Sequence, residues 1–123
     1  MVCIVIHPNG INIPANEITD ILKNTETVLQ EYIVPTAKRF FLYKINVNGT
    51  ASAIIRWYLN NGYQESTRTS HQDRKGIIEY PAPAGIPLKT GDTIKVTVEH
   101  QGSFNDHPQT FQSNIEGGIL DDY

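Results

Sequence analysis

The strongest constraint on the fold of this chain is a side-chain period of two that turn-forming residues interrupt at short intervals. The clearest example is residues 93–100, TIKVTVEH, where isoleucine and valine alternate with lysine, threonine and glutamate. Successive side chains of a β-strand point to opposite faces, so this pattern predicts a strand with one buried and one exposed face. Gly91 and Asp92, which come directly before it, are typical turn residues.

Other segments show the same period or a short run of β-branched and aromatic residues. They are residues 28–34, 38–47, 51–60, 63–69, 76–80 and 110–120. Within 38–47, one face is expected to carry Phe41, Tyr43, Ile45 and Val47. The residues Asn60-Asn61-Gly62 predict a hairpin turn. About seven to eight short strands separated by turn signals indicate an all-β protein, a single antiparallel β-sandwich or jelly roll.

Length and composition restrict the class of protein further. The chain has 123 residues, which favours one domain, and a net charge of −3, which argues against a nucleic-acid binder that neutralises phosphates. No apolar run reaches the roughly 18 residues of a membrane helix, so no membrane partner is expected. Cys3 is the single cysteine, which excludes an internal disulfide. No phosphate-binding glycine loop occurs, and we expect no cofactor.

The first 27 residues differ in pattern from the rest. Residues 2–6, VCIVI, are apolar, and Pro8-Asn9-Gly10 follows them as a hairpin signal. Residues 16–24 are the one helix candidate, because Ile18, Ile21 and Leu22 have helical spacing. We therefore expect an N-terminal arm over residues 1–27, with at most one short helix, followed by a β-sandwich domain over residues 28–123.

Several residues raise the question of catalysis or metal binding. His100, Asp106 and His107 lie close in sequence and could hold a metal ion, but their spacing matches no tight zinc pattern. Asp92 could be a catalytic carboxylate, yet beside Gly91 it is better interpreted as a turn former. No nucleophile motif occurs. We expect no catalytic, cofactor-binding or metal-binding residues and no enzyme.

Aromatic residues form the other candidate site. Trp57 shares a predicted face with Ile55 and Leu59, which favours a place in the core. Tyr58 points the other way, beside Arg56, and a binding surface could also include the residues Tyr63, Arg68 and Tyr80. Tyrosine and arginine are enriched at protein interfaces, so the surface suits an inter-subunit contact as well as a sugar platform.

A longer pattern spans residues 35 to 120. It consists of PTAKRFFLYKINVNG, a strand with Ile55 and Trp57, the LNNGY hairpin, TRTS, a proline-rich piece, IPLKTGDTIKVTVEH and a last strand ending in Glu116-Gly117-Gly118. This order resembles small β-sandwich modules of tailed-bacteriophage virion proteins, found in head decoration, neck and tail accessory positions. Residues 1–27 lie outside the resemblance.

The resemblance implies a non-enzymatic structural protein of the virion, made in the host cytoplasm and present in many copies. Its expected partners are other virion proteins (capsid, neck or tail subunits) and further copies of itself as a homo-oligomer. The expected contact residues are those of the arm and of the exposed strand face: Val2, Ile4, Ile6, Arg56, Tyr58, Tyr63 and Arg68. The alternative is a carbohydrate-binding β-sandwich module of a phage fibre or cell-wall protein, with a glycan as its ligand.

Overall fold

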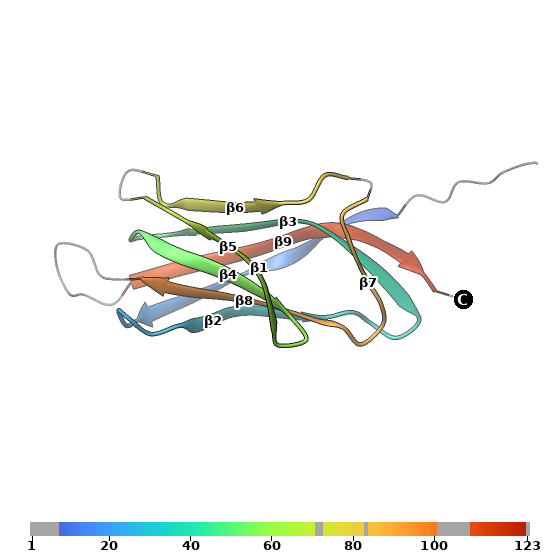
Figure 1. The fold of residues 1–123 in the computed structure, drawn as a ribbon, viewed down its shortest axis with the longest axis horizontal. Coiled ribbons are helices and arrows are strands. Elements are labelled where there is room, and N and C mark those ends of the chain that lie inside the picture. The colour runs from blue at the N-terminus through green and yellow to red at the C-terminus, as the bar shows by residue number, and fades with distance from the viewer. Residues whose placement is uncertain (1–7, 71–72, 83, 101–108, 123) are drawn as a thin grey trace, which may run out of the picture.

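The computed structural model (Figure 1) describes residues 8–70, 73–82, 84–100 and 109–122. These residues form nine strands and no helix, and therefore no helix able to cross a membrane. The strands are β1 (Asn9–Ile21), β2 (Thr27–Ile33), β3 (Lys38–Gly49), β4 (Ala53–Leu59), β5 (Gly62–Arg68), β6 (Lys75–Glu79), β7 (Ile86–Leu88), β8 (Thr93–His100) and β9 (Gln109–Asp121).

The strands form two antiparallel sheets that pack together, as expected for a β-sandwich (Figure 1). Sheet 1 has the order β1-β9-β3-β6, and β7 pairs with the part of β3 that β6 leaves free. Sheet 2 has the order β2-β8-β4-β5. The all-β prediction is confirmed, and the expected strands over 28–100 and 110–120 are present.

The core lies between the sheets and is built from the alternate residues of their strands. Ile94, Val96 and Val98 are fully buried, as the alternation in TIKVTVEH predicts. Trp57 is only 1% exposed, which confirms its place in the core. The largest buried side chains come from both sheets: Trp57, Phe40, Phe111, Leu29, Leu42, Ile45, Ile55, Ile94 and Ile115.

Strand β3 departs from the expected alternation. Phe40 and Leu42 are buried together with Ile45 and Val47, whereas Phe41 and Tyr43 are only partly buried. The pairing of β3 with β9 shifts register between Leu42 and Lys44. This β-bulge moves the buried set from even to odd positions along the strand. The prediction that Phe41 and Tyr43 share the face of Ile45 and Val47 is therefore wrong.

The prediction of a helix over residues 16–24 is also wrong. Residues 9–21 form β1, which pairs along its length with β9. Its register shifts between Ile13 and Asn16 and again between Ile18 and Ile21. Because of these irregularities, apolar residues that are separated by an odd number of positions face the same core. Their spacing in the sequence therefore resembles the spacing of apolar residues in a helix.

The N-terminal segment is therefore part of the sandwich over residues 9–21 rather than a separate arm. Asn9 and Gly10, expected in a turn, lie opposite Ile119 and Gly118 in the β1–β9 ladder. The side chain of Gln30 donates from Nε2 to the Pro14 carbonyl oxygen over 2.8 Å and so ties β1 to β2. Residues 1–7 lie outside the described residues.

Two turns close one end of sheet 2. Asn60 and Asn61 have φ of 50° and 69°, which is the backbone of a tight hairpin turn, as the sequence predicts. Gly91 has a φ of 87°. The Asp92 carboxylate accepts hydrogen bonds from the Lys89 backbone N–H and from Asn60 Nδ2, both over 2.9 Å. Asp92 thus joins the two turns, in agreement with its interpretation as a turn former.

Gly91 and Gly10 allow a matched test of backbone strain. A Cβ atom at either glycine would meet no atom within 4 Å, but only Gly91 has a positive φ. Gly91→Val should therefore lower the free energy of unfolding by about 1–3 kcal/mol. Gly10→Val, in an exposed strand position, should change it by less than about 0.5 kcal/mol. Urea unfolding of both variants measures the difference, and equal effects would contradict this account.

Candidate functional site

The outer face of sheet 2 brings together three of the residues singled out from the sequence. Arg56 and Tyr58 are neighbours on one face of β4, and Tyr63 of β5 lies directly opposite Tyr58. Lys95 lies opposite Tyr58 on the other side, in β8. Residues directly opposite in an antiparallel pair point to the same face. We call Glu26, Arg56, Tyr58, Tyr63 and Lys95 the tyrosine face.

Charged side chains in the middle of the tyrosine face are held in place by hydrogen bonds and an ion pair. Arg56 Nη1 donates to Glu99 Oε1 over 3.1 Å and lies 3.7 Å from Glu26 Oε2. The Tyr58 hydroxyl donates to Glu26, and Thr97 Oγ1 donates to Glu26 Oε1 over 2.8 Å. Glu26 therefore accepts from two hydroxyls and pairs with a guanidinium, so the positions of these side chains depend on one another.

Contacts of Tyr58 with Tyr63 and Lys95 continue the cluster toward β5. The Tyr58 and Tyr63 rings meet edge to face, with centroids 6.1 Å apart. Lys95 Nζ lies 4.8 Å from the centre of the Tyr58 ring and donates to Asn61 Oδ1 over 3.2 Å. Tyr63 remains 56% exposed. The face thus presents a large aromatic side chain to solvent beside a constrained charged cluster.

The cluster also shifts the pKa values of its members. The hydrogen bond from Tyr58 lowers the pKa of the Glu26 carboxyl below its ordinary value, and the same bond raises the pKa of the Tyr58 hydroxyl. The hydrogen bond to Glu99 raises the pKa of the Arg56 guanidinium. Each shift moves a group further from titration near neutral pH.

Arg68 lies on the same outer face but is not part of the cluster around Glu26. It lies opposite Ile54, at the far end of β5 from Tyr63. Five residues of strand correspond to roughly 16 Å, so Arg68 and Tyr63 would meet different parts of a partner. Val2, Ile4 and Ile6, the other expected contact residues, lie outside the described residues.

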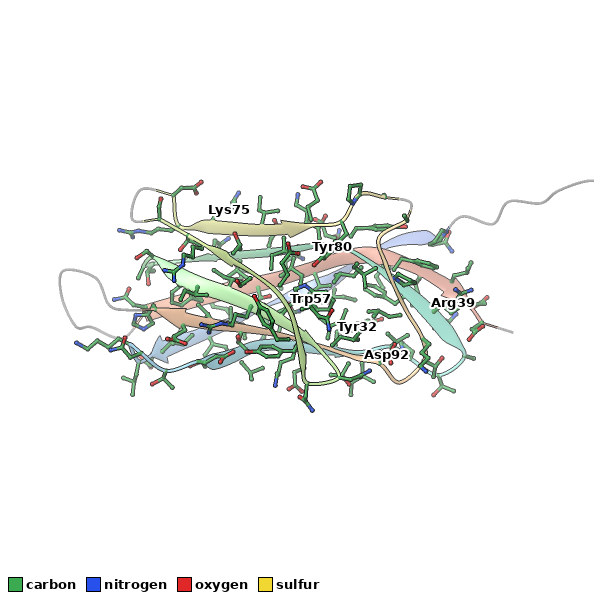
Figure 2. All side chains as sticks on the ribbon, viewed as in Figure 1. Tyr32, Arg39, Trp57, Lys75, Tyr80 and Asp92 are labelled. Atoms are coloured by element: carbon green, nitrogen blue, oxygen red, sulfur yellow. The ribbon has the colours of Figure 1, made fainter. Side chains whose placement is uncertain are left out.

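Tyr80 belongs to the edge of the core rather than to this face. Trp57 Nε1 donates to the Tyr80 hydroxyl oxygen over 2.9 Å, the two rings meet edge to face, and the Tyr80 hydroxyl donates to Glu65. Burial and the bond to Glu65 raise the pKa of Tyr80 to about 12. Figure 2 shows Trp57 and Tyr80 close together in the middle of the sandwich. Trp57 therefore offers no stacking surface, and Tyr80 is only partly exposed.

His100, one of the two histidines considered for metal binding, is a core residue. His100 is 1% exposed, its Nε2 lies 2.7 Å from the Ile21 carbonyl oxygen, and its ring packs against Phe111. Asp106 and His107 lie outside the described residues. Over the ranges that the structure describes, no group of three histidine, cysteine, aspartate or glutamate residues could hold a metal ion.

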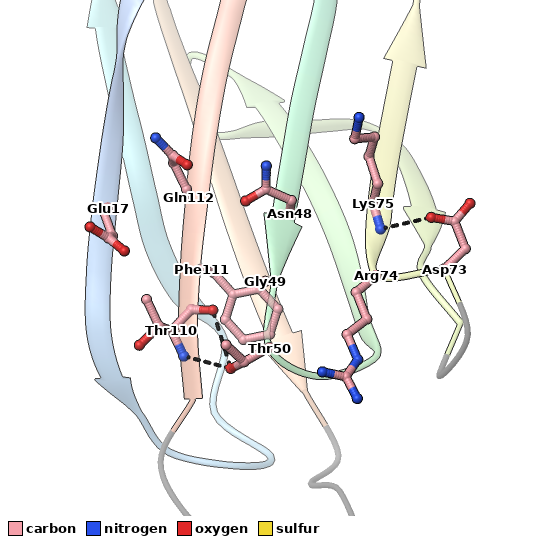
Figure 3. A pocket seen from close by; sticks show the side chains of 10 residues that line it. All are labelled: Glu17, Asn48, Gly49, Thr50, Asp73, Arg74, Lys75, Thr110, Phe111 and Gln112. Atoms are coloured by element: carbon pink, nitrogen blue, oxygen red, sulfur yellow. Dashed lines mark hydrogen bonds between the residues drawn. The ribbon is translucent and has the colours of Figure 1, made fainter.

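A hollow on the outer face of sheet 1 was not predicted from the sequence. Figure 3 shows Glu17, Gln112, Asn48 and Lys75 side by side, one from each of four neighbouring strands. They are directly opposite one another in the ladders β1–β9, β9–β3 and β3–β6. The hollow measures about 390 Å³, and Arg74 and Asp73 lie at its edge.

A second hollow of about 360 Å³ adjoins the first and shares Asn48, Lys75 and Gln112 with it. Its further lining residues are Ala15, Lys44, Asn46, Ile77 and Asn114. Amides therefore recur at alternate positions of two adjacent strands, at 46 and 48 in β3 and at 112 and 114 in β9. This spacing was visible in the sequence, but the pairing of β3 with β9 was not. We call the two hollows together the amide groove.

The pH dependence of stability tests the Glu26 cluster. Because the folded-state pKa of Glu26 is lowered, its contribution is complete above its unfolded pKa of about 4.3 and is lost as the pH falls through the folded pKa. Glu26→Gln should therefore destabilise the protein at pH 7, and the difference from the unaltered chain should shrink below pH ~4. Urea unfolding across this pH range measures it.

Glu31→Gln is the matched control, because Glu31 lies opposite Lys95 on the same sheet yet has no side-chain hydrogen bond or ion pair with the described residues. This variant should be close to neutral in stability at pH 7. A Glu26→Gln effect that stays constant down to pH 2 would contradict the proposed cluster.

Comparison with known proteins finds no family model, no curated protein and no solved structure that matches this chain. The geometry of the tyrosine face and the amide groove is therefore the basis for assigning a function.

Proposed function

We propose that this chain is a non-enzymatic structural protein of a bacteriophage virion, a capsid decoration or neck and tail accessory protein, that stabilises the particle through contacts between subunits. The observation that carries the proposal is the tyrosine face, an ordered and partly aromatic surface on a rigid sheet. The resemblance of residues 35–120 to β-sandwich modules of tailed-phage virions supports it. The partners would be further copies of this chain and neighbouring virion proteins.

The order of the strands supports a jelly roll, the finer class of sandwich. The pairs β1 with β9, β2 with β8, β3 with β6 and β7, and β4 with β5 are nested, as in one long hairpin rolled up on itself. The additional pairs β3–β9 and β4–β8 close the roll. Jelly rolls are a common architecture of viral capsid proteins, and of lectins as well. The topology thus agrees with the proposal and with its alternative.

The tyrosine face has the composition of an interface. Tyrosine and arginine are enriched at protein contacts, and a ring with two rotatable torsions loses little entropy when it is buried. The hydrogen bond from Tyr58 to Glu26, the ion pair of Arg56 with Glu26 and the hydrogen bond from Arg56 to Glu99 constrain Arg56 and Tyr58 before a partner arrives. Exposed apolar side chains of the same sheet, Val28 at 42% and Ile33 at 61%, extend the surface toward β2.

The alternative function, carbohydrate binding through Tyr58, Tyr63 and Tyr80, has less support on sheet 2. The Tyr80 ring packs on Trp57, and the Tyr58 ring is occupied by Tyr63 on one side and Lys95 on another. The hydroxyls of Tyr58 and Tyr80 both bond to carboxylates. Only Tyr63 is largely exposed, and one ring makes a small platform for a sugar.

Self-association tests the role of the tyrosine face. The purified protein should be a homo-oligomer, and Tyr63→Ala should weaken its association by roughly tenfold or more, because exposed tyrosines at interfaces often dominate binding. Gln64→Ala, the adjacent exposed position on β5, is the control and should leave the assembly intact. Light scattering coupled to size-exclusion chromatography measures both. A chain that stays monomeric at all concentrations would argue against the proposal.

The N-terminal residues need a separate test. Deleting residues 1–27 would remove β1 with its buried Ile13 and Ile21 and so damage the body itself. Deleting residues 1–7 alone removes Val2, Ile4 and Ile6 and spares every strand of the described structure. We expect the shortened chain to keep its thermal stability and to assemble less well. Unchanged assembly would exclude a role for these residues.

A further inference from the structure

The amide groove carries an inference that is independent of the virion proposal. We infer that the outer face of sheet 1 binds an oligosaccharide along the groove that runs over β9, β3 and β6. Three features support this site: the side-chain chemistry of the groove, its length, and the amides of Asn48 and Gln112, which bond to no other described side chain.

The chemistry of the lining suits vicinal hydroxyl groups. A sugar hydroxyl both donates and accepts hydrogen bonds, and a side-chain amide does the same with its NH₂ group and its oxygen. Four amides line the two hollows, from two adjacent strands: Asn46, Asn48, Gln112 and Asn114. A phosphate or a purely anionic ligand would instead favour a surface of cations and backbone N–H groups.

The amides at the centre of the groove are not engaged elsewhere. Asn48 and Gln112 are exposed, and their side chains make no hydrogen bond with another described residue. Asn114 Nδ2 donates to the Ile13 carbonyl oxygen over 3.2 Å, and Asn114 Oδ1 accepts a hydrogen bond from Asn46 Nδ2 over 3.4 Å. The groove thus combines two amides that are oriented by hydrogen bonds within the protein with two amides that are available to a ligand.

The dimensions fit an extended chain rather than a single small molecule. The two hollows, of about 390 and 360 Å³, adjoin each other and share the lining residues Asn48, Lys75 and Gln112. From Asn48 to Lys44 along β3, the groove spans four residues, or roughly 13 Å. Ile77, which is 43% exposed, lies opposite Asn46 and offers an apolar contact for the C–H face of a sugar ring.

Charge adds a preference among oligosaccharides. The lining contains Lys44, Arg74 and Lys75 together with Glu17 and Asp73. Lys44 has Glu79 of β6 and Glu116 of β9 directly opposite it, whereas Lys75 lies opposite the neutral Asn48. No ion pair joins the side chains of these cations to the carboxylates within the described residues. Chains that carry carboxylate groups should therefore bind more tightly than neutral ones of the same length, through Lys75 above all, which lines both hollows.

A glycan array tests the inference. The array should carry neutral hexose oligomers and oligomers that contain uronic or sialic acids, and titration calorimetry should confirm each positive. We expect binding by the unaltered chain, a loss of roughly tenfold or more in the Asn48→Ala/Gln112→Ala double variant, and full retention in Gln64→Ala. Lys75→Gln should weaken acidic oligomers selectively. Both altered amides are exposed, so the variants should remain folded, and thermal unfolding is the measurement that checks this.

Each other outcome overturns the inference. Absence of binding to every member of the array would exclude an oligosaccharide site, and binding that survives the double variant would place the site elsewhere. A double variant of reduced oligomeric mass would show that the groove is an interface between copies. The Tyr63→Ala experiment measures self-association, whereas the array measures sugar binding. A negative result for the subunit contact therefore leaves the oligosaccharide site untouched, and the reverse also holds.

Discussion

The structure depends above all on the position of β9 between β1 and β3. A strand from the end of the chain thereby holds together a strand from its beginning and one from its middle. The close approach needs Gly117, where a Cβ atom would lie 2.3 Å from Phe40 Cζ and 2.4 Å from the Phe41 carbonyl oxygen. With no side chain at this position, the Phe40 ring reaches the core, where it is fully buried.

Pairing between strands determines both candidate surfaces: β9 with β3 for the amide groove, and β4 with β5 and β8 for the tyrosine face. Sheet 1 places its apolar residues inward, so the alternate residues of β9 and β3 form the amide groove on the outside. Sheet 2 buries Trp57, Val96 and Val98 and leaves the tyrosine face outside. The two surfaces thus lie on opposite sides of one core. A protein built this way can bind a neighbouring subunit through one sheet and a second ligand through the other, without conflict between them.

The two surfaces differ in how far they are ordered in advance. On the tyrosine face, Glu26 joins Tyr58, Thr97 and Arg56, so an approaching partner meets side chains with little freedom left to lose. In the amide groove, the side chains of Asn48 and Gln112 make no hydrogen bond with another described residue. Binding there would have to order these side chains, which favours a ligand that satisfies several amides at once.

The sequence by itself determined the strands from residue 27 onward except β7, whose residues it assigned to a proline-rich connector. It also determined the hairpin at Asn60-Asn61, the turn at Gly91-Asp92 and the burial of Trp57. These features depend on local patterns: the period of two, and residues that tolerate positive φ. It also placed Arg56, Tyr58 and Tyr63 on one outer face. Arg56 and Tyr58 are two residues apart on one strand, and Tyr63 lies opposite Tyr58 across a short hairpin.

Only the tertiary structure decided the rest, because the remaining features depend on pairing between distant strands. The bulges in β1 and β3 break the local alternation of buried and exposed residues. For this reason the sequence pattern wrongly predicts a helix over residues 16–24 and a core position for Phe41. The register of both strands is set by their pairing with β9. Glu26 lies outside any strand, and its contacts with Tyr58 and Arg56 follow from folding alone. The amide groove needs residues 46–48 and 112–114 side by side, and no local pattern in the sequence specifies which strands are neighbours.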